Sequence, residues 1–185
     1  MTWDELDFGD HPGIDGAPVA TSATSATWIL QPDSMKARRA HRIPLTAEAV
    51  ALLKGLPRMV VSPYVFWAHR GGQLSDMSLS AVMRRMQETE EKAGRDGFLD
   101  PKNRRPAVPH GLRSTLRQWT AEKGYARDMA ELALAHNVGT EVERSYQRSD
   151  MLERRRAMMA DWAAFLRGEA GHSQVKGDRG GIQMP

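Results

Sequence analysis

The sequence has 185 residues, 41% hydrophobic and 26% charged, a balance typical of one globular domain. It contains no cysteine, which excludes disulfides and cysteine nucleophiles, and its six histidines lack the spacing of metal ligands. No apolar run approaches the ~20 residues of a membrane helix, and the acidic N-terminus does not have the pattern of a signal peptide. We therefore expect a cytoplasmic protein with no membrane partner.

The formal net charge of +3 hides an uneven distribution of charge along the chain. Residues 1–35 contain six of the 23 acidic residues and no lysine or arginine, so the remainder carries 26 basic against 17 acidic side chains. Such a basic body suits a polyanion, most simply nucleic acid. Charge alone is equally compatible with an ordinary solvated basic surface.

The front of the chain has the pattern of a small antiparallel sheet. Three segments indicate short strands by their alternation or their aromatic and β-branched content: residues 2–8, 27–30 and 42–45. Residues 9–26 are rich in Gly, Pro, Ala, Ser and Thr and indicate a long loop. A basic hairpin over residues 35–41 precedes the third strand. Because proline has no N–H to donate, Pro44 indicates that this strand lies at the edge of the sheet or that Pro44 lies at the end of the strand.

Helices dominate the rest of the chain. Periodicity and capping residues, such as Thr46 before the first helix, predict helices over residues 47–55, 78–94, 109–124, 126–135, 141–146 and 151–167. Residues 168–185 lack apolar periodicity and indicate a disordered tail. The expected fold class is mainly α with a small N-terminal antiparallel β-sheet (α+β), with one domain over residues 1–167.

Two of these helices carry apolar stripes that predict the core. The helix from Pro109 presents Leu112, Leu116 and Trp119 on one face. The last helix is expected to bury Leu152, Met159, Trp162, Ala163 and Leu166.

His110 and Arg113 lie three residues apart at the start of a predicted helix, so they share a face. An imidazole and a guanidinium beside the free N–H groups of a helix N-terminus suit a phosphate. Such a pair also arises often by chance, and a structural role is its commoner explanation.

Two further residues add to this signal. His136 ends one predicted helix and Tyr146 lies near the end of the next, so a short turn can bring both to one cleft. A tyrosine can be a covalent nucleophile, although its pKa near 10 requires help from neighbours and most tyrosines are structural. Lys36, in the basic hairpin, is suited to proton donation, to a plain phosphate contact or to simple solvation.

The order and spacing of these residues are shared with a known family. The matching stretches are residues 35–45 (MKARRAHRIPL), 108–115 (VPHGLRST), 131–136 (ELALAH), Tyr146 and 152–159 (LERRRAMM). With them the chain resembles, over residues 1–167, the catalytic domain of the tyrosine recombinase (phage-type integrase) family, and most of all the prophage integrases of proteobacteria.

The resemblance implies a DNA strand-transferring enzyme in which Tyr146 attacks the scissile phosphate of double-stranded DNA and forms a 3′-phosphotyrosyl bond. Arg113 clamps the non-bridging oxygens. His110 and His136 hydrogen-bond the phosphoryl group, and Lys36 protonates the departing 5′-oxygen. The family needs no metal, cofactor or small-molecule substrate, and its protomers assemble as a tetramer on DNA, with the last helix packed in cis or on a neighbour.

The same resemblance implies that backbone phosphates are contacted by arginines outside the reaction centre. Such contacts supply most of the affinity and make it strongly salt-dependent. The residues expected in this role are Arg38, Arg39, Arg42, Arg104, Arg105 and Arg117.

The sequence departs from the family pattern before its first strand. The family places another catalytic arginine there, with a glutamate three residues later, but no arginine precedes Arg38 here. Loss of one phosphate clamp costs on the order of 3 kcal/mol or more. We therefore expect a chain truncated before this arginine, inactive or nearly so alone, with a non-catalytic DNA-binding remnant or interaction module as the alternative. Residues 88–105 are expected to be an insertion.

Overall fold

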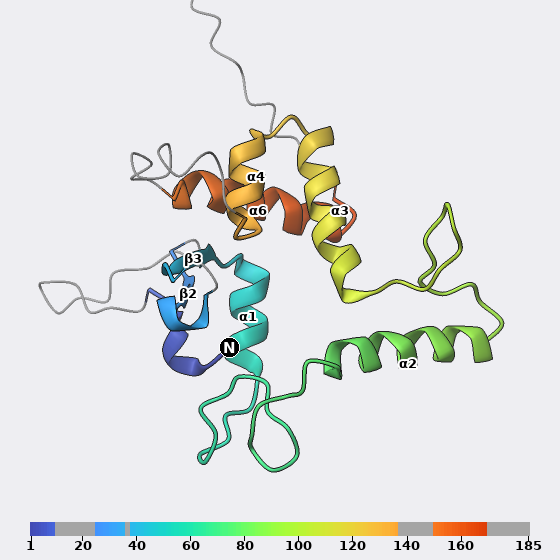
Figure 1. Ribbon diagram of the computed structural model, residues 1–185, viewed down its shortest axis with the longest axis horizontal. Coiled ribbons are helices and arrows are strands. Elements are labelled where there is room, and N and C mark those ends of the chain that lie inside the picture. The colour runs from blue at the N-terminus through green and yellow to red at the C-terminus, as the bar shows by residue number, and fades with distance from the viewer. Residues whose placement is uncertain (10–24, 36–37, 137–149, 170–185) are drawn as a thin grey trace, which may run out of the picture.

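The computed structural model describes residues 1–9, 25–35, 38–136 and 150–169. Its elements are η1 (Trp3–Glu5), β1 (Leu6–Asp7), β2 (Thr27–Leu30), η2 (Pro32–Ser34), β3 (His41–Pro44), α1 (Ala47–Gly55), α2 (Ser78–Lys92), α3 (Pro109–Glu122), α4 (Arg127–Ala133) and α6 (Leu152–Leu166) (Figure 1). The described part is mainly helical with one small sheet, as the sequence predicts. Lys36, Tyr146, the predicted helix over residues 141–146 and residues 170–185 lie outside the described residues.

The three strands form one antiparallel sheet in the order β1–β2–β3. Trp28 of β2 pairs with Leu6 on one side and with Ile43 on the other. Pro44 is the last residue of β3, at the edge of this sheet, where the missing N–H of a proline is tolerated. The predicted sheet and the position of Pro44 are confirmed.

The predicted strand over residues 2–8 is wrong in its first half, because Trp3–Glu5 form a 3-10 helix and only Leu6–Asp7 are extended. One carboxylate oxygen of Glu5 accepts hydrogen bonds from the backbone N–H of Thr2 at 2.9 Å and from the indole N–H of Trp28 at 3.0 Å. A carboxylate that reaches back three residues closes a turn, and this local interaction outweighs the alternating pattern.

The sheet and α1 enclose one hydrophobic core, formed by Ala26, Leu45, Val50, Leu53 and Val65. The predicted N-cap of α1 is confirmed, because the Thr46 hydroxyl accepts a hydrogen bond from the Ala49 N–H. In the part of the chain that the structure describes, no helix has the length and apolar character needed to cross a bilayer.

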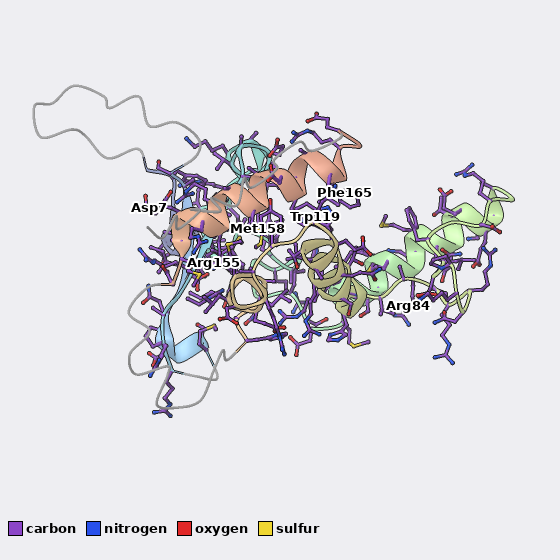
Figure 2. All side chains as sticks on the ribbon, turned by 90° about the horizontal axis from the view of Figure 1, so that it is seen from above. Asp7, Arg84, Trp119, Arg155, Met158 and Phe165 are labelled. Carbon is purple, nitrogen blue, oxygen red and sulfur yellow. The ribbon has the colours of Figure 1, made fainter. Side chains whose placement is uncertain are left out.

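A second core lies between α3, α4 and α6 and contains Leu116, Met129, Leu134 and the fully buried Met158. Trp119 of α3 also belongs to it and packs against the aromatic rings of α6 (Figure 2). Because α6 contacts both α4 and β3, it joins this helical core to the sheet.

Two residues of the predicted core are exposed. Leu112 on α3 is 64% exposed and Leu166 at the end of α6 is 65% exposed, so these two predictions are wrong. On α6 the residues that are buried are Arg155 and Met158, because β3 approaches the first turns of this helix and changes which face is covered.

The stretch over residues 88–105 completes α2 and then folds back on it. The buried Gln87 side chain donates to the Asp96 carbonyl at 3.0 Å and accepts from the Phe98 N–H at 2.7 Å. Gly97 has a φ of +69°, and a Cβ at this position would lie 2.6 Å from Oε1 of Gln87. The excursion is therefore held by specific hydrogen bonds that require glycine at its turn.

Candidate functional site

The site begins at the N-terminus of α3. Pro109 occupies the first helical position, where its fixed φ favours helix initiation and its missing N–H is not needed. His110 follows and is exposed. Arg113 follows one turn later, so its side chain lies on the same face of the helix as that of His110.

Arg113 reaches the residues that follow α4. Its Nη2 atom donates to the Leu134 carbonyl at 2.6 Å and lies 2.8 Å from Nε2 of His136. A guanidinium can only donate, so Nε2 is the acceptor and the imidazole proton belongs on Nδ1. That nitrogen lies 2.5 Å from a carboxylate oxygen of Glu131, which accepts its hydrogen bond.

His136 is turned toward Arg113 by the way α4 ends. The His136 N–H bonds to the Glu131 carbonyl at 2.9 Å, and the Ala135 N–H bonds to the Leu132 carbonyl at 3.1 Å. This is a Schellman motif with Ala135 in the left-handed region at φ +55°. A non-glycine residue in that region costs roughly 1–2 kcal/mol, which the surrounding contacts must offset.

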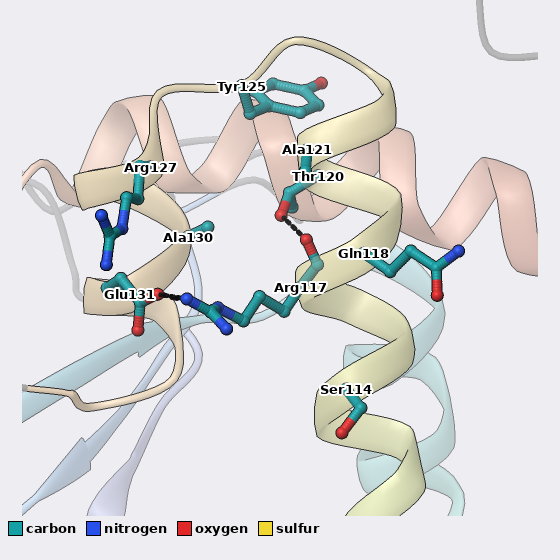
Figure 3. A pocket seen from close by; sticks show the side chains of 9 residues that line it. All are labelled: Ser114, Arg117, Gln118, Thr120, Ala121, Tyr125, Arg127, Ala130 and Glu131. Carbon is teal, nitrogen blue, oxygen red and sulfur yellow. Dashed lines mark hydrogen bonds and ion pairs between the residues drawn. The ribbon is translucent and has the colours of Figure 1, made fainter.

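Glu131 ties the two helices together and was not identified from the sequence. Its second carboxylate oxygen accepts a hydrogen bond from Nε of Arg117 at 2.8 Å and forms an ion pair with Nη2 of the same residue at 2.8 Å (Figure 3). The hydrogen bonds from His136 and Arg117 hold the pKa of this carboxyl below its usual value. Arg113 and Arg117 lie four residues apart on α3 and therefore share a face, but this spacing does not specify which acidic residue that face meets.

A pocket of about 420 Å³ lies beside this contact, between α3 and α4 (Figure 3). Arg117, Arg127 and Glu131 line its polar side and Tyr125 lies at its far end. The site is thus a linked series of groups in the order Arg113, His136, Glu131, Arg117.

The remaining basic residues occupy separate parts of the surface. Arg42 on β3 pairs with Asp150, and Arg104 pairs with Asp96 at 2.8 Å. The side chains of Arg38, Arg39 and Arg105 are exposed and make no ion pair with the described residues. The structure therefore brings Arg113, His136 and Arg117 together, with His110 on the same helix, whereas Lys36 and Tyr146 lie outside the described residues.

Residues 21–153 match the family model described as the Phage integrase family. Prophage integrase IntA of Escherichia coli (strain K12) is 30% identical over 168 residues, which cover 89% of this chain and 33% of that protein. Prophage integrase IntZ of the same strain is 34% identical over 142 residues, covering 75% and 31%. The integrase of Shigella phage Sf6 is 28% identical over 134 residues, covering 71% and 31%.

The chain spans about a third of the length of these relatives. No solved structure shows a significant match to it. The family match covers most of the chain, including the α3 and α4 residues that build the site. It confirms the resemblance seen in the sequence, and the chain belongs to the phage integrase family of tyrosine recombinases.

Proposed function

We propose that this chain takes part in site-specific DNA recombination and integration, by cutting and rejoining DNA strands through a 3′-phosphotyrosyl intermediate. The observation that supports this most is the contact between Arg113 and His136, 2.8 Å apart, in a member of the phage integrase family. A guanidinium and an imidazole held together at an exposed helix start suit the oxygens of a phosphodiester.

In the proposed reaction the Tyr146 hydroxyl attacks phosphorus and His110 takes its proton. A bond forms between phosphorus and the tyrosine oxygen, and the bond from phosphorus to the 5′-oxygen breaks. Lys36 gives the departing oxygen a proton. One phosphate ester replaces another, so the step uses no metal or cofactor and the intermediate can be rejoined to a new strand.

Arg113 and His136 act on the non-bridging oxygens in this proposal. Arg113 donates hydrogen bonds as negative charge develops. His136 accepts at Nε2 in the structure, so this nitrogen must take up a proton before it can donate to phosphate. The carboxylate of Glu131 holds the Nδ1 side of the ring, which makes Glu131 a positioning residue for this step.

Double-stranded DNA is the proposed partner, together with further protomers in a tetramer, in the cytoplasm. The six arginines proposed to contact backbone phosphates fall into two groups. Arg42, Arg104 and Arg117 are held in ion pairs at 2.8 Å and must share or release their carboxylates to bind phosphate. Arg38, Arg39 and Arg105 need no such exchange with the described residues.

A second function is favoured by one observation, which is that no arginine precedes Arg38 in these 185 residues. The family uses another arginine upstream of the first strand to clamp the phosphate. We propose that these residues by themselves cleave DNA poorly, and that a non-catalytic DNA-binding or interaction module is the alternative.

The test uses a pool of randomised duplex DNA carrying single-strand nicks. A short strand released beside a nick dissociates, so even slow cleavage accumulates as a covalent complex that survives washing with detergent. We expect a low yield of this complex, abolished by Tyr146→Phe and unaffected by the matched control Tyr64→Phe. DNA retention that falls steeply with salt, without any covalent product, favours the non-catalytic alternative.

The proton donor has a separate test. A DNA site recovered from the pool is prepared with sulfur in place of the departing 5′-oxygen, because a thiolate leaves without being protonated. Lys36→Ala should slow cleavage of ordinary DNA at least tenfold and leave cleavage of the sulfur-containing DNA within threefold of the parent. An equal loss on both substrates contradicts the proposed role of Lys36.

A further inference from the structure

α2 projects away from both hydrophobic cores and from the sheet, as two perpendicular views show (Figure 1, Figure 2). One side of this helix is covered within the chain, because the buried Gln87 side chain is hydrogen-bonded to Asp96 and Phe98. Its other contact with a described helix or strand is with α3. The side that carries Leu79 and Val82 is exposed, so α2 presents one of its faces to solvent.

The exposed face of α2 is apolar. Leu79, Val82 and Met86 follow one another at intervals of three and four residues, so they form one stripe, and they are 66%, 43% and 46% exposed. The exposed Ala93 continues this stripe just after the helix ends. We call these four residues the α2 stripe. An apolar face of this kind is typical of a surface that binds another protein.

An apolar cavity adjoins the α2 stripe at Met86. It has a volume of about 320 Å³ and lies between α2, the excursion that folds back on it, and α3. Phe98 and Leu112, on its two far sides, are themselves exposed. The apolar surface is therefore wider than the stripe of one helix and continues onto α3.

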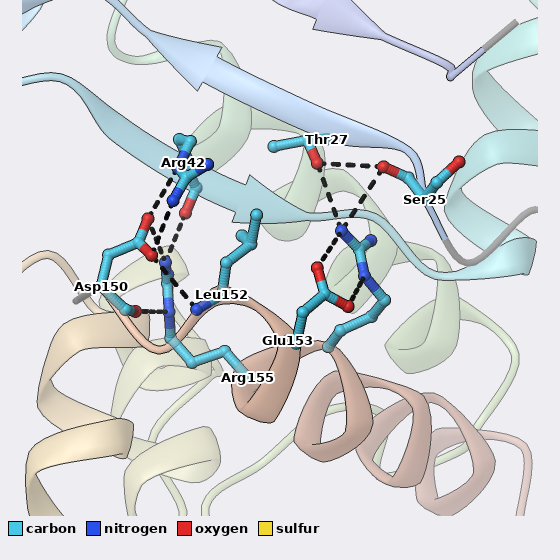
Figure 4. A network of polar contacts seen from close by, with 8 residues as sticks. Ser25, Thr27, Arg42, Asp150, Leu152, Glu153 and Arg155 are labelled. Carbon is cyan, nitrogen blue, oxygen red and sulfur yellow. Dashed lines mark hydrogen bonds and ion pairs between the residues drawn. The ribbon is translucent and has the colours of Figure 1, made fainter. Parts of the chain in front are cut away.

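Two charges of opposite sign lie along one edge of the α2 stripe. Arg85 is three residues after Val82 and Glu88 is three residues further on, so both lie on the same side of it. Both are exposed, and neither forms an ion pair with a described residue; the ion pair of α2 joins Glu90 to Arg95. At the junction of β3 and α6, by contrast, charges are paired within the chain, as Figure 4 shows for Arg42 and Asp150.

This pattern of charge is complementary to itself. When two α2 helices pack face to face and antiparallel about a two-fold axis, the same edge of each helix faces that edge of the other. Arg85 of each copy then lies opposite Glu88 of the other, which gives two ion pairs. Charges at such flanking positions set the partner and the orientation of paired helices.

The same register also matches the apolar side chains by size. When residue 85 of one copy lies opposite residue 88 of the other, the two Met86 side chains meet at the centre of the contact. Leu79 of each copy then lies beside Ala93 of the other, so a large side chain faces a small one at both ends. Charge and shape therefore favour the same antiparallel arrangement.

We propose that the α2 stripe is a docking surface for a second copy of this chain, bound antiparallel through the α2 stripe of that copy. Arg85 and Glu88 select the orientation and the register, and the apolar side chains supply the affinity. A contact limited to one helix and its neighbours is small, so we expect reversible association at micromolar concentrations. The inference does not depend on the proposed roles of Tyr146 and Lys36.

The first test is sedimentation equilibrium of the 185-residue chain without DNA, over about 1–300 µM. The weight-average mass should rise from that of one chain toward that of two and no further, because a two-fold contact closes on itself. Leu79→Asp should raise the dissociation constant about tenfold or more, whereas Leu52→Asp, at an exposed position on α1, should leave it unchanged. A mass of one chain at every concentration, or equal effects of the two variants, overturns the proposal.

The second test exchanges the charges. Arg85→Glu and Glu88→Arg each place like charges opposite one another, so each variant alone should associate about tenfold or more weakly than the parent. An equimolar mixture of the two variants restores both ion pairs between unlike chains and should associate within about threefold of the parent. A mixture that associates no better than its components overturns the antiparallel arrangement.

Arg84→Glu is the matched control for the charge variants. Arg84 is exposed and lies two residues from both Val82 and Met86, so it is on the opposite face of α2. The same change of charge there should leave the dissociation constant unchanged, and a loss equal to that of Arg85→Glu would contradict docking through the α2 stripe. Circular dichroism checks that each variant folds, and the exposed charge variants decide the question if Leu79→Asp does not.

Discussion

Glu131→Gln is the substitution that most sharply tests how the site is organised. The change keeps the size of the side chain but removes the negative charge that His136 and Arg117 share through two hydrogen bonds and an ion pair. Hydrogen bonds to a charged group contribute about 1.5–3 kcal/mol, but Arg117 and His136 are 55% and 46% exposed, so solvent screens these contacts. Allowing for this screening and for the bonds that an amide retains, we expect a loss of about 1 kcal/mol, or roughly fivefold in single-turnover cleavage.

Nitrogen NMR of the His136 ring provides a readout that does not depend on cleavage. The parent should carry its proton on Nδ1, and Glu131→Gln should shift the population toward the other tautomer. Glu122→Gln is the matched control, because the Glu122 carboxylate accepts from Gln118 within α3. A parent with its proton on Nε2, or a Glu131→Gln rate within twofold of the parent, contradicts this arrangement of the site.

Three further predictions concern stability, each measured by urea unfolding. Trp119→Ala should lower the free energy of unfolding by roughly 3–5 kcal/mol, because the indole is buried among aromatic rings. Leu112→Ala should lower it by less than about 1 kcal/mol, because Leu112 is exposed. Similar losses for both variants would contradict the assignment of Trp119, and not Leu112, to the buried face of α3. Ala135→Gly should stabilise the fold by about 0.5–1 kcal/mol because glycine accepts the left-handed conformation, and a destabilisation contradicts this. Burial and the nearby Arg155 lower the pKa of His41 below 6.5. The unfolded chain therefore binds this proton more readily than the folded chain, and the free energy of unfolding should fall as the pH drops below about 6.5. His41→Gln should remove this part of the pH dependence, and an unchanged slope between pH 7 and 5 counts against it.

Much of the fold was predictable because its signals are local. A threonine before a stretch with helical apolar periodicity is a good N-cap, as Thr46 is here. Pro109 favours a helix start because its φ is already fixed near the helical value. The pairing of residues 27–30 with β3 follows from short apolar segments on either side of a hairpin. In these cases the deciding interaction lies within a few residues of the pattern that indicates it.

The remaining features depend on partners distant in sequence. Leu112 has the periodicity of a core residue, but the described elements pack against the other turns of α3. Arg155 is a charged residue on a helix, and only the approach of β3, 113 residues earlier, explains its burial. Glu131 accepts a hydrogen bond from His136 only because the turn after α4 directs the His136 side chain back toward it.

If Tyr146 forms the covalent bond to DNA, peptide mass spectrometry of the trapped complex will locate the nucleotide on this residue. After nuclease and trypsin digestion, we expect a nucleotide remnant on the peptide of residues 145–148, which contains Tyr146. A remnant on any other residue, or an adduct that survives in Tyr146→Phe, contradicts the role of Tyr146 as nucleophile.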